Sequence, residues 1–500
     1  MIDKKINFNI EIVWLAIAYT IMHGGILLMP NAVFWDDWLL YRSSDAIILQ
    51  TFREAGSIFN SAGYLHVFML WMGVWSYKFF TFVLMFGSGV LLNFILKRNA
   101  LLPREGRFLV VLLFLILPFN FARIAAIDFP YALCYFLFFL AWSVIDRYRI
   151  TAALLFLASF NINSLLVFYV LPILDLLYRT HRPWILKSLA RFPLYRPELL
   201  VAPFVFYFVK VKYFQAVGFY EGYNENLQYQ NMEKAAKLQF KDLATIEFNE
   251  LVFLALLPIA FFIFLKKINT DSEKIGLKLF AILLLAGVFS FFLGALPYWI
   301  LGLVPTFNEW ASRHQLLLPL GTALVISSLL LPCPKPLKLA AVSALVSACL
   351  SLGIVNYYDF AVDWNKQKTL VKLFSENEDI RRADVVLMND STTGFNAIKR
   401  EYRFYEWNGL LERAFNDQTR FALPSNNLKW YFLNDINRLS SEMYKAGSHE
   451  VKELPKVVEV KIEQLPRNRD GIYLLENWFT QLKIIVDVVD IKTHHSMNVP

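Results

Sequence analysis

Two adjacent carboxylates, Asp36 and Asp37, stand in the segment FWDDWLLYR at positions 34–42, directly after the first long apolar run of the chain. The aromatic side chains around them prefer the boundary between lipid and water. Two acids beside a membrane repel each other and lose hydration, so they need a cation, a hydrogen-bond donor or a reaction to serve. One carboxylate could accept a proton from an attacking hydroxyl while the other orients it. The alternative is the start of an interfacial helix, where a single acid would complement the dipole.

A third acid, Asp128, precedes Pro130 in a short polar interruption between two apolar runs, and Arg123 stands in the same interruption. Because the connector is short, both charged side chains must lie close to the membrane boundary. Two interpretations stay open for Asp128. It belongs to the same site as the acid pair, or it is a cap before the proline or a local ion pair with Arg123.

Cations that suit a phosphate stand at two further places. Arg313 and His314 come just before a long apolar run, where an arginine on the outer side runs against the positive-inside bias. A guanidinium beside an imidazole suits a phosphate or pyrophosphate. Lys210 ends another apolar run. The alternative for each is a side chain that snorkels to the membrane surface, or a histidine satisfied by its neighbours.

The composition predicts the elements that must position these side chains. With 57% hydrophobic and 18% charged residues, the chain has too much apolar surface for a soluble protein. The formal charge of +8 could suggest a nucleic-acid partner, but the basic residues cluster in short connectors, which is how membrane topology is encoded. Anionic lipid is therefore the expected partner, and nucleic acid is not. The sequence contains no Walker loop and no dinucleotide fingerprint.

A spanning helix needs about 20 apolar residues, fewer where helices break or tilt. The sequence therefore predicts a polytopic α-helical membrane protein with about 11 transmembrane segments. They are expected at Ile10–Met29, Ser76–Leu96, Phe108–Phe121, Pro130–Ile145, Ile150–Phe160, Ser164–Tyr178, Leu199–Phe214, Leu251–Leu265, Ile275–Leu296, Gln315–Leu331 and Leu339–Val355.

The basic connectors all fall on one side, which is then the cytoplasm. A first outer loop over residues 30–75 is expected to form helices along the membrane surface, starting with Asp45–Phe59. From Met232 the polar loop before residue 250 reads as a helix with Lys234, Lys237 and Lys241 on one face, and it could form a lid. Residues 1–356 are predicted to form the membrane domain.

Residues 357–500 are predicted to form a soluble α/β domain outside the membrane. Helix-like periodicity alternates there with runs of β-branched residues. Helices are expected at Asp363–Arg382 and Tyr402–Phe415, and strands at Asp384–Met388, Val457–Gln464 and Leu482–Ile491.

An N-terminal span, an aspartate pair in a long first outer loop, another acid in the next outer loop, many spans and a soluble tail outside together resemble the GT-C glycosyltransferases. These are integral-membrane enzymes that use sugars linked to polyprenyl phosphate. The motif that carries the resemblance is Asp36-Asp37, and Asp128 and Arg313-His314 match by position. The chain looks most like the bacterial members that decorate O-antigen, lipopolysaccharide or other surface polysaccharides.

This resemblance implies that Asp36 or Asp37 is the base on the acceptor hydroxyl and that Asp128 assists the acceptor or a metal. Some branches hold a divalent cation, Mg²⁺ or Mn²⁺, between the first-loop and second-loop acids, here Asp36 and Asp128, and others need none. The donor phosphate would be held by Arg313, His314 and Lys210. Transfer would proceed with inversion, to a lipid-linked glycan or another surface acceptor, on the outer face of a bacterial cytoplasmic membrane.

Two other classes remain open. An O-antigen polymerase or ligase is also multispanning, but that class uses arginine and histidine in large late loops and lacks a first-loop acid pair. A lipid or glycan transporter tends to show repeated halves, broken helices and paired charges within the membrane. The sequence shows none of these features.

Overall fold

The computed structural model describes residues 2–41, 43–99, 102–180, 195–222, 229–246, 249–267, 276–307, 310–425, 455–464 and 484–491. Arg42 of the FWDDWLLYR segment thus lies outside the described residues. The chain divides into two compact units, Met1–Pro30 with Phe52–Asn356, and Asn31–Thr51 with Tyr357–Pro500. We expected the whole first loop to belong with residues 1–356, whereas residues 31–51 group with the C-terminal part. The acid pair is therefore a feature of the second unit.

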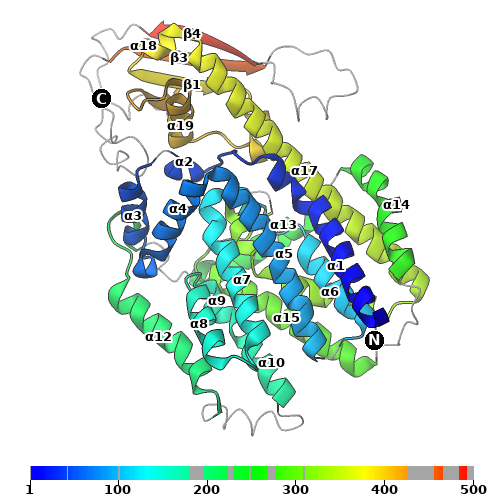
Figure 1. Cartoon of the computed structure of the whole chain (residues 1–500). Coiled ribbons are helices and arrows are strands. Elements are labelled where there is room, and N and C mark those ends of the chain that lie inside the picture. The colour runs from blue at the N-terminus through cyan, green and yellow to red at the C-terminus, as the bar shows by residue number, and fades with distance from the viewer. Residues whose placement is uncertain are drawn as a thin grey trace. The chain divides into compact units, whose positions relative to one another are not determined.

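The first unit is helical. Short 3-10 helices, among them η3 (Phe121–Ile124), η4 (Ala126–Asp128) and η6 (Trp310–Gln315), connect its longer helices. Its described α-helices are α1 (Ile2–His23), α4 (Ser61–Met72), α5 (Val74–Asn99), α6 (Arg104–Ile116), α7 (Phe129–Val144), α8 (Arg149–Ser159), α9 (Ser164–Phe168), α10 (Val170–Thr180), α12 (Pro197–Tyr213), α13 (Tyr229–Ala244), α14 (Glu250–Lys267), α15 (Leu277–Ile300), α16 (Leu318–Leu330) and the first part of α17 (Lys335–Ser375) (Figure 1).

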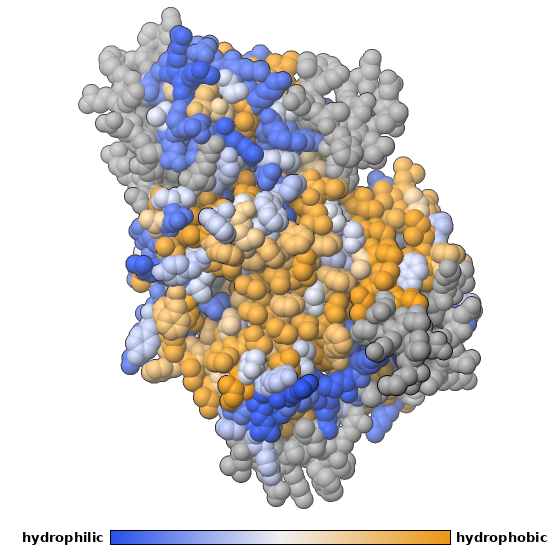
Figure 2. Space-filling view, in the orientation of Figure 1, coloured by the Kyte–Doolittle hydropathy of each residue, from blue (hydrophilic) through white to orange (hydrophobic). Residues whose placement is uncertain are grey.

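Five helices in the described residues are long and apolar enough to cross a membrane: Ile10–Leu28, Val74–Asn99, Ala126–Val144, Leu277–Ile300 and Lys335–Ser375. They suggest a multi-pass membrane protein, and each overlaps an expected span. On the face seen in Figure 2, hydrophobic side chains gather over helices α1, α5 and α7 of the first unit. Three further apolar helices are shorter, Arg149–Ser159, Glu250–Ile263 and Leu318–Leu330. The larger number of about 11 segments stays a prediction.

The second unit contains a four-stranded mixed sheet with the strand order β2-β1-β3-β4. Its strands are β1 (Val385–Asp390), β2 (Phe421–Pro424), β3 (Val457–Gln464) and β4 (Ile484–Ile491). Strand β1 runs parallel to both β2 and β3, with Val385 opposite Phe421 on one side and Val457 on the other. Strand β4 is antiparallel to β3. The prediction of a C-terminal α/β fold is thus confirmed, although β2 was not foreseen.

The helices of the second unit are α2 (Asp37–Leu40), most of α3 (Asp45–Glu54), the second part of α17, α18 (Glu378–Arg382) and α19 (Phe404–Phe415). Their apolar faces meet the sheet in one core, in which Trp38, Leu370, Phe374 and Leu410 are buried. We expected a span ending at Val355 and a separate helix from Asp363. The expected interruption of the helix between Val355 and Asp363 was wrong, because α17 continues without a break over 41 residues, although the two units divide between Asn356 and Tyr357.

Candidate active site

The acid pair lies in a tight turn that leads into α2. Trp35, just before the pair, has φ of 51°, which is the left-handed region that a bulky residue rarely occupies. Its ring is buried and packs edge-on against Phe360 of α17, with ring centroids 5.5 Å apart. Backbone strain of this kind persists only where packing holds it and is common at functional sites. The turn therefore presents the two acids in a fixed arrangement.

The two carboxylates have different surroundings. Asp37 is 3% exposed, and its Oδ2 accepts a hydrogen bond of 3.2 Å from the backbone N–H of Phe34. This contact closes the turn from within. Asp36 is partly exposed, and its side chain is directed to α19. The sequence left open which aspartate is the base, and this geometry favours Asp36.

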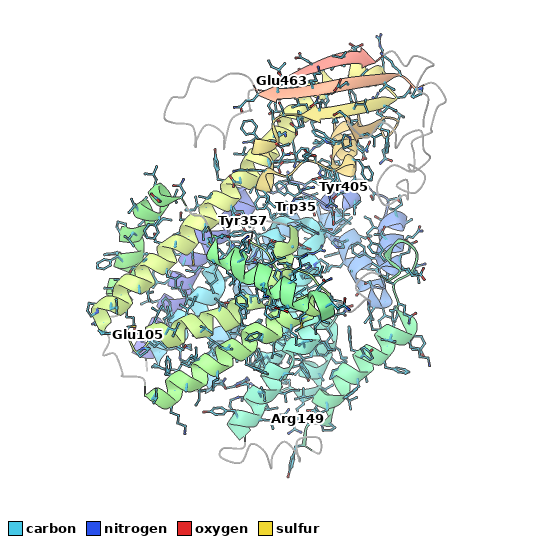
Figure 3. All side chains as sticks on the ribbon, turned by 180° about the vertical axis from the view of Figure 1, so that it is seen from behind. Trp35, Glu105, Arg149, Tyr357, Tyr405 and Glu463 are labelled. Atoms are coloured by element: carbon cyan, nitrogen blue, oxygen red, sulfur yellow. The ribbon has the colours of Figure 1, made fainter. Side chains whose placement is uncertain are left out.

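Asp36 is held by a tyrosine that sequence reasoning did not single out. The hydroxyl of Tyr405 donates a hydrogen bond of 2.9 Å to Asp36 Oδ1, and the labelled residues Trp35 and Tyr405 mark the two segments in Figure 3. Burial and the nearby charge of Asp36 raise the pKa of Tyr405. The phenol therefore stays protonated and acts as a donor. No local pattern links positions 36 and 405, so nothing in the sequence could have found this pair.

Tyr405 is itself fixed by the first turn of α19. The next residue, Glu406, is buried, and both of its oxygens lie 2.7 Å from Nη2 of Arg400. Glu406 Oε2 also accepts a hydrogen bond of 2.8 Å from the backbone N–H of Arg403. Burial raises the pKa of Glu406, and the charge of Arg400 opposes that rise. These contacts define the start of the helix and so the direction of the Tyr405 side chain.

A buried polar network lies behind this turn in the same unit. The ammonium of Lys366 is 2.6 Å from Asp390 Oδ2 and 2.6 Å from Asn396 Oδ1. Asp363 accepts hydrogen bonds from the Tyr402 hydroxyl and from the backbone N–H of residue 397. Lys366, Asp363, Asn396 and Tyr402 are buried, and Asp390 is partly buried. A closed network of this kind fixes the loop between β1 and α19, and we assign it a structural role.

In the first unit, Asp128 lies at the end of η4 and is 5% exposed. Asp128 and Arg313 both lie close enough to the hydroxyl of Tyr298 to interact with it electrostatically. Arg123 donates hydrogen bonds to the backbone carbonyls of Asn120 and of residue 119. The structure thus brings the second-loop acid and the late arginine around one tyrosine of α15.

Arg313 and His314 lie side by side on η6. The guanidinium of Arg313 stacks over the ring of Trp310 at 4.6 Å, and its Nε donates to Nε2 of His314 at 3.3 Å. The imidazole stacks on Tyr298, with ring centroids 4.7 Å apart. Burial, and then the charge of Arg313, lower the pKa of His314 to about 3. The ring is therefore neutral, with its proton on Nδ1, so it can donate a hydrogen bond to an anion but adds no charge.

Lys210 has a different position. Its ammonium donates a hydrogen bond to the backbone carbonyl of Gly56, which ties α12 to the segment after α3. Gly56 has φ of 72°, and a Cβ there would lie 2.7 Å from the carbonyl oxygen of Phe214. This close approach explains why position 56 is a glycine. The hydrogen bond to the carbonyl of Gly56 gives Lys210 a structural role. Its expected role as a ligand of the donor phosphate stays a prediction.

The described residues contain no cluster of three or more His, Cys, Asp or Glu side chains that could hold a metal ion. Asp36 and Asp128, the two acids of the expected cation site, belong to different units. Comparison of the chain with protein-family models, with curated proteins and with solved structures finds no match.

Proposed function

We propose that this protein is a membrane glycosyltransferase that moves a sugar from a polyprenyl-phosphate carrier to a surface glycan. The observation that carries the proposal is the asymmetry of the acid pair. Asp37 is buried and serves its own turn, whereas Asp36 is partly exposed and held by Tyr405. A carboxylate oriented by a hydrogen-bond donor and open to solvent suits a general base.

In the proposed reaction, a hydroxyl oxygen of the acceptor attacks the anomeric carbon of the donor sugar. The bond from that carbon to the phosphate oxygen breaks, polyprenyl phosphate leaves, and the hydroxyl proton passes to Asp36. The new bond forms on the opposite face, so the configuration inverts. Orientation of the two reactants and stabilisation of the leaving phosphate supply much of the rate.

The donor phosphate is assigned to Arg313. Its guanidinium is stacked on Trp310, which restricts its orientation, and a planar fork of donors fits a phosphate. His314 adds a neutral donor at Nδ1.

The acceptor class and the side of the membrane are part of the proposal. A lipid-linked glycan, lipopolysaccharide or O-antigen on the outer face of a bacterial cytoplasmic membrane would be the acceptor, with the C-terminal unit on the same face. The basic connectors of the sequence support this orientation. Mass spectrometry of surface glycans from cells with and without this protein tests the proposal, because a missing residue identifies sugar and acceptor together. Identical glycans in the two strains would refute it.

A transporter is the second candidate, and one observation favours it. Lys78 lies in α5, one of the helices long enough and apolar enough to cross a membrane. It is buried, and its ammonium donates a hydrogen bond to the carbonyl of Ile124. Intramembrane charges often mark a transport pathway. Movement of a labelled glycolipid across vesicles that contain the protein, without transfer of its sugar, would favour this candidate.

A further inference from the structure

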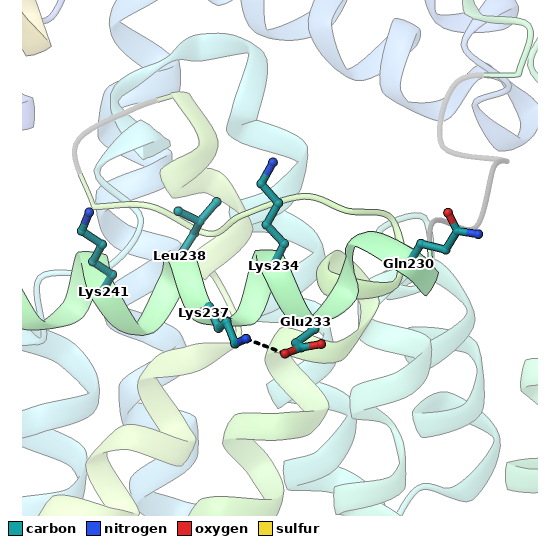
Figure 4. Close-up of a pocket in the computed structure, with 6 residues that line it drawn as sticks. All are labelled: Gln230, Glu233, Lys234, Lys237, Leu238 and Lys241. Atoms are coloured by element: carbon teal, nitrogen blue, oxygen red, sulfur yellow. Dashed lines mark ion pairs between the residues drawn. The ribbon is translucent and has the colours of Figure 1, made fainter.

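Helix α13 carries two lysines on one face with an apolar side chain between them. Lys234, Leu238 and Lys241 follow one another at intervals of four and three residues, so they lie along one side of the helix. Figure 4 shows the three side chains pointing to the same side. With Gln230 and other residues of the helix they line a hollow of about 410 Å³. The two ammonium groups thus flank an open surface.

The positive charge of this surface is not cancelled nearby. Glu233 and Lys237 line the hollow as well, and they pair with each other, with Oε1 and Nζ 2.5 Å apart (Figure 4), so three lysines face one carboxylate there. Asp242 is engaged as well, because its Oδ2 accepts a hydrogen bond of 2.8 Å from the backbone N–H of Phe307. Within the described residues, Lys234 and Lys241 form no ion pair. An anion from outside the chain could pair with both.

The face of α13 opposite the lysines determines the level of the helix relative to the membrane. Ala235 and Gln239 are buried against α15, and Gln239 Oε1 accepts a hydrogen bond of 2.7 Å from Trp299 Nε1. Helix α15 is long and apolar enough to span a membrane, and Trp299 lies at its end. The end of a span lies at the level of the lipid headgroups. The contact therefore places α13 at the headgroup level.

Large apolar side chains of α13 also remain exposed. Leu238, between the two lysines, is 43% exposed, and Met232 and Phe240, on other sides of the helix, are 36% and 49% exposed. A helix with lysines on one part of its surface and large apolar side chains on others is typical of helices that lie in a membrane interface. A nucleic acid would pair with the lysines but leave the apolar side chains in water. A lipid provides a phosphate for the lysines and acyl chains for the apolar groups.

From these observations we propose that α13 binds the phosphate groups of anionic membrane lipids through Lys234 and Lys241, with Leu238 inserted between the lipids. Each lysine near an anionic surface strengthens binding by about fivefold. The attraction depends on ionic strength, because salt screens it. The lipid would hold the helix against the membrane surface. This inference does not depend on the proposed glycosyl transfer.

The test uses the full chain in nanodiscs with an environment-sensitive fluorophore on a cysteine placed at Gln230. Cys134 and Cys349 are buried, and Cys333 is replaced by serine so that only the new cysteine is labelled. Raising the fraction of phosphatidylglycerol in phosphatidylcholine discs should shift the emission to shorter wavelength. Added salt should reverse the shift. The double variant Lys234→Gln/Lys241→Gln should lose it.

The matched control is Lys399→Gln/Lys461→Gln, which removes two exposed lysines of the second unit and should respond like the unchanged protein. All four lysines are exposed, so thermal unfolding should not change. An equal response of the α13 variant and the control would overturn the proposal. So would a response to inorganic phosphate or to an oligonucleotide in discs of phosphatidylcholine alone, because the ligand would then be a free anion or a nucleic acid.

Discussion

The hydroxyl of Tyr405 lies 2.9 Å from Asp36 Oδ1, although the two residues are 369 positions apart in the sequence. Both residues belong to the second unit, in which the contact joins the turn before α2 to α19. It gives the C-terminal unit a direct part in the proposed chemistry, because the orientation of the base depends on a residue of that unit.

Asp36→Asn should abolish sugar transfer, because an amide cannot accept the hydroxyl proton. General-base catalysis contributes about 10²–10⁴-fold to a rate, so we expect a loss of at least that order. Asp37→Asn should keep most of the transfer, since its amide oxygen can still accept the hydrogen bond from Phe34. Complementation of cells that lack the protein, followed by mass spectrometry of their surface glycans, compares the variants. Equal loss in both would show that the base cannot be assigned from this geometry.

Tyr405→Phe removes only the hydroxyl that donates a hydrogen bond to Asp36 and keeps the ring. We expect slower transfer with a shifted pH profile, and a stability loss of about 1 kcal/mol. Tyr207→Phe is a matched control, because the side chain of Tyr207 is exposed. A double-mutant cycle with Asp36→Ala, which removes the acceptor, is measured by thermal unfolding and tests the contact independently of activity. Additive effects of the two substitutions on stability would mean that the hydrogen bond is absent.

Gly409→Ala should weaken the attachment of the acid-bearing turn to α19. A Cβ at Gly409 would lie 2.1 Å from Cε3 of Trp38, and that indole is buried. Such overpacking costs about 1–3 kcal/mol. Thermal unfolding and tryptophan fluorescence should both report the change. Gly394→Ala is the matched control, because a Cβ there meets no atom within 4 Å. Unchanged stability of the Gly409 variant would mean that the indole can move at little cost.

The sequence predicted the elements of the second unit better than their contacts. Strands β1 and β3 and helix α19 follow from local periodicity, and each was expected close to its observed bounds. Strand β2 was missed because it has only four residues and ends in Pro424, so it offers no alternating pattern. The break expected after Val355 came from a change from apolar to polar residues. That change marks a new environment for α17 and does not end the helix.

The candidate site was predictable only in part, because local sequence patterns do not encode tertiary contacts. An acid doublet in an aromatic frame is visible in the sequence, and so is an arginine beside a histidine. The partner of Asp36 and the burial of Asp37 depend on tertiary contacts, which local patterns do not encode. The neutral state of His314 also depends on burial. The sequence suggested a guanidinium beside an imidazole, and the structure gives one cation with a neutral donor.

Stability should fall with acid as His314 is forced to take a proton. Burial and the charge of Arg313 lower its pKa to about 3 from the ordinary value of 6.5. Between these pH values the unfolded chain binds more protons than the folded one, so folding weakens as the pH falls through this window. Thermal unfolding should show a steeper loss toward about pH 4.5 in the unchanged protein than in His314→Gln. Parallel curves for the two proteins would show that His314 is protonated without cost.

Arg313→Ala should chiefly weaken binding of the polyprenyl-phosphate sugar donor. Hydrogen bonds to charged groups contribute about 1.5–3 kcal/mol, which corresponds to roughly a tenfold to hundredfold weaker binding of a polyprenyl monophosphate. Arg313→Lys keeps the charge but loses both the planar fork and the stacking on Trp310. Its affinity for the lipid should therefore lie between that of the unchanged protein and that of Arg313→Ala. Native mass spectrometry of the purified protein with the lipid measures all three. Unchanged binding in Arg313→Ala would leave Asp36 as the proposed base but would move the phosphate site elsewhere, because the two assignments rest on separate contacts.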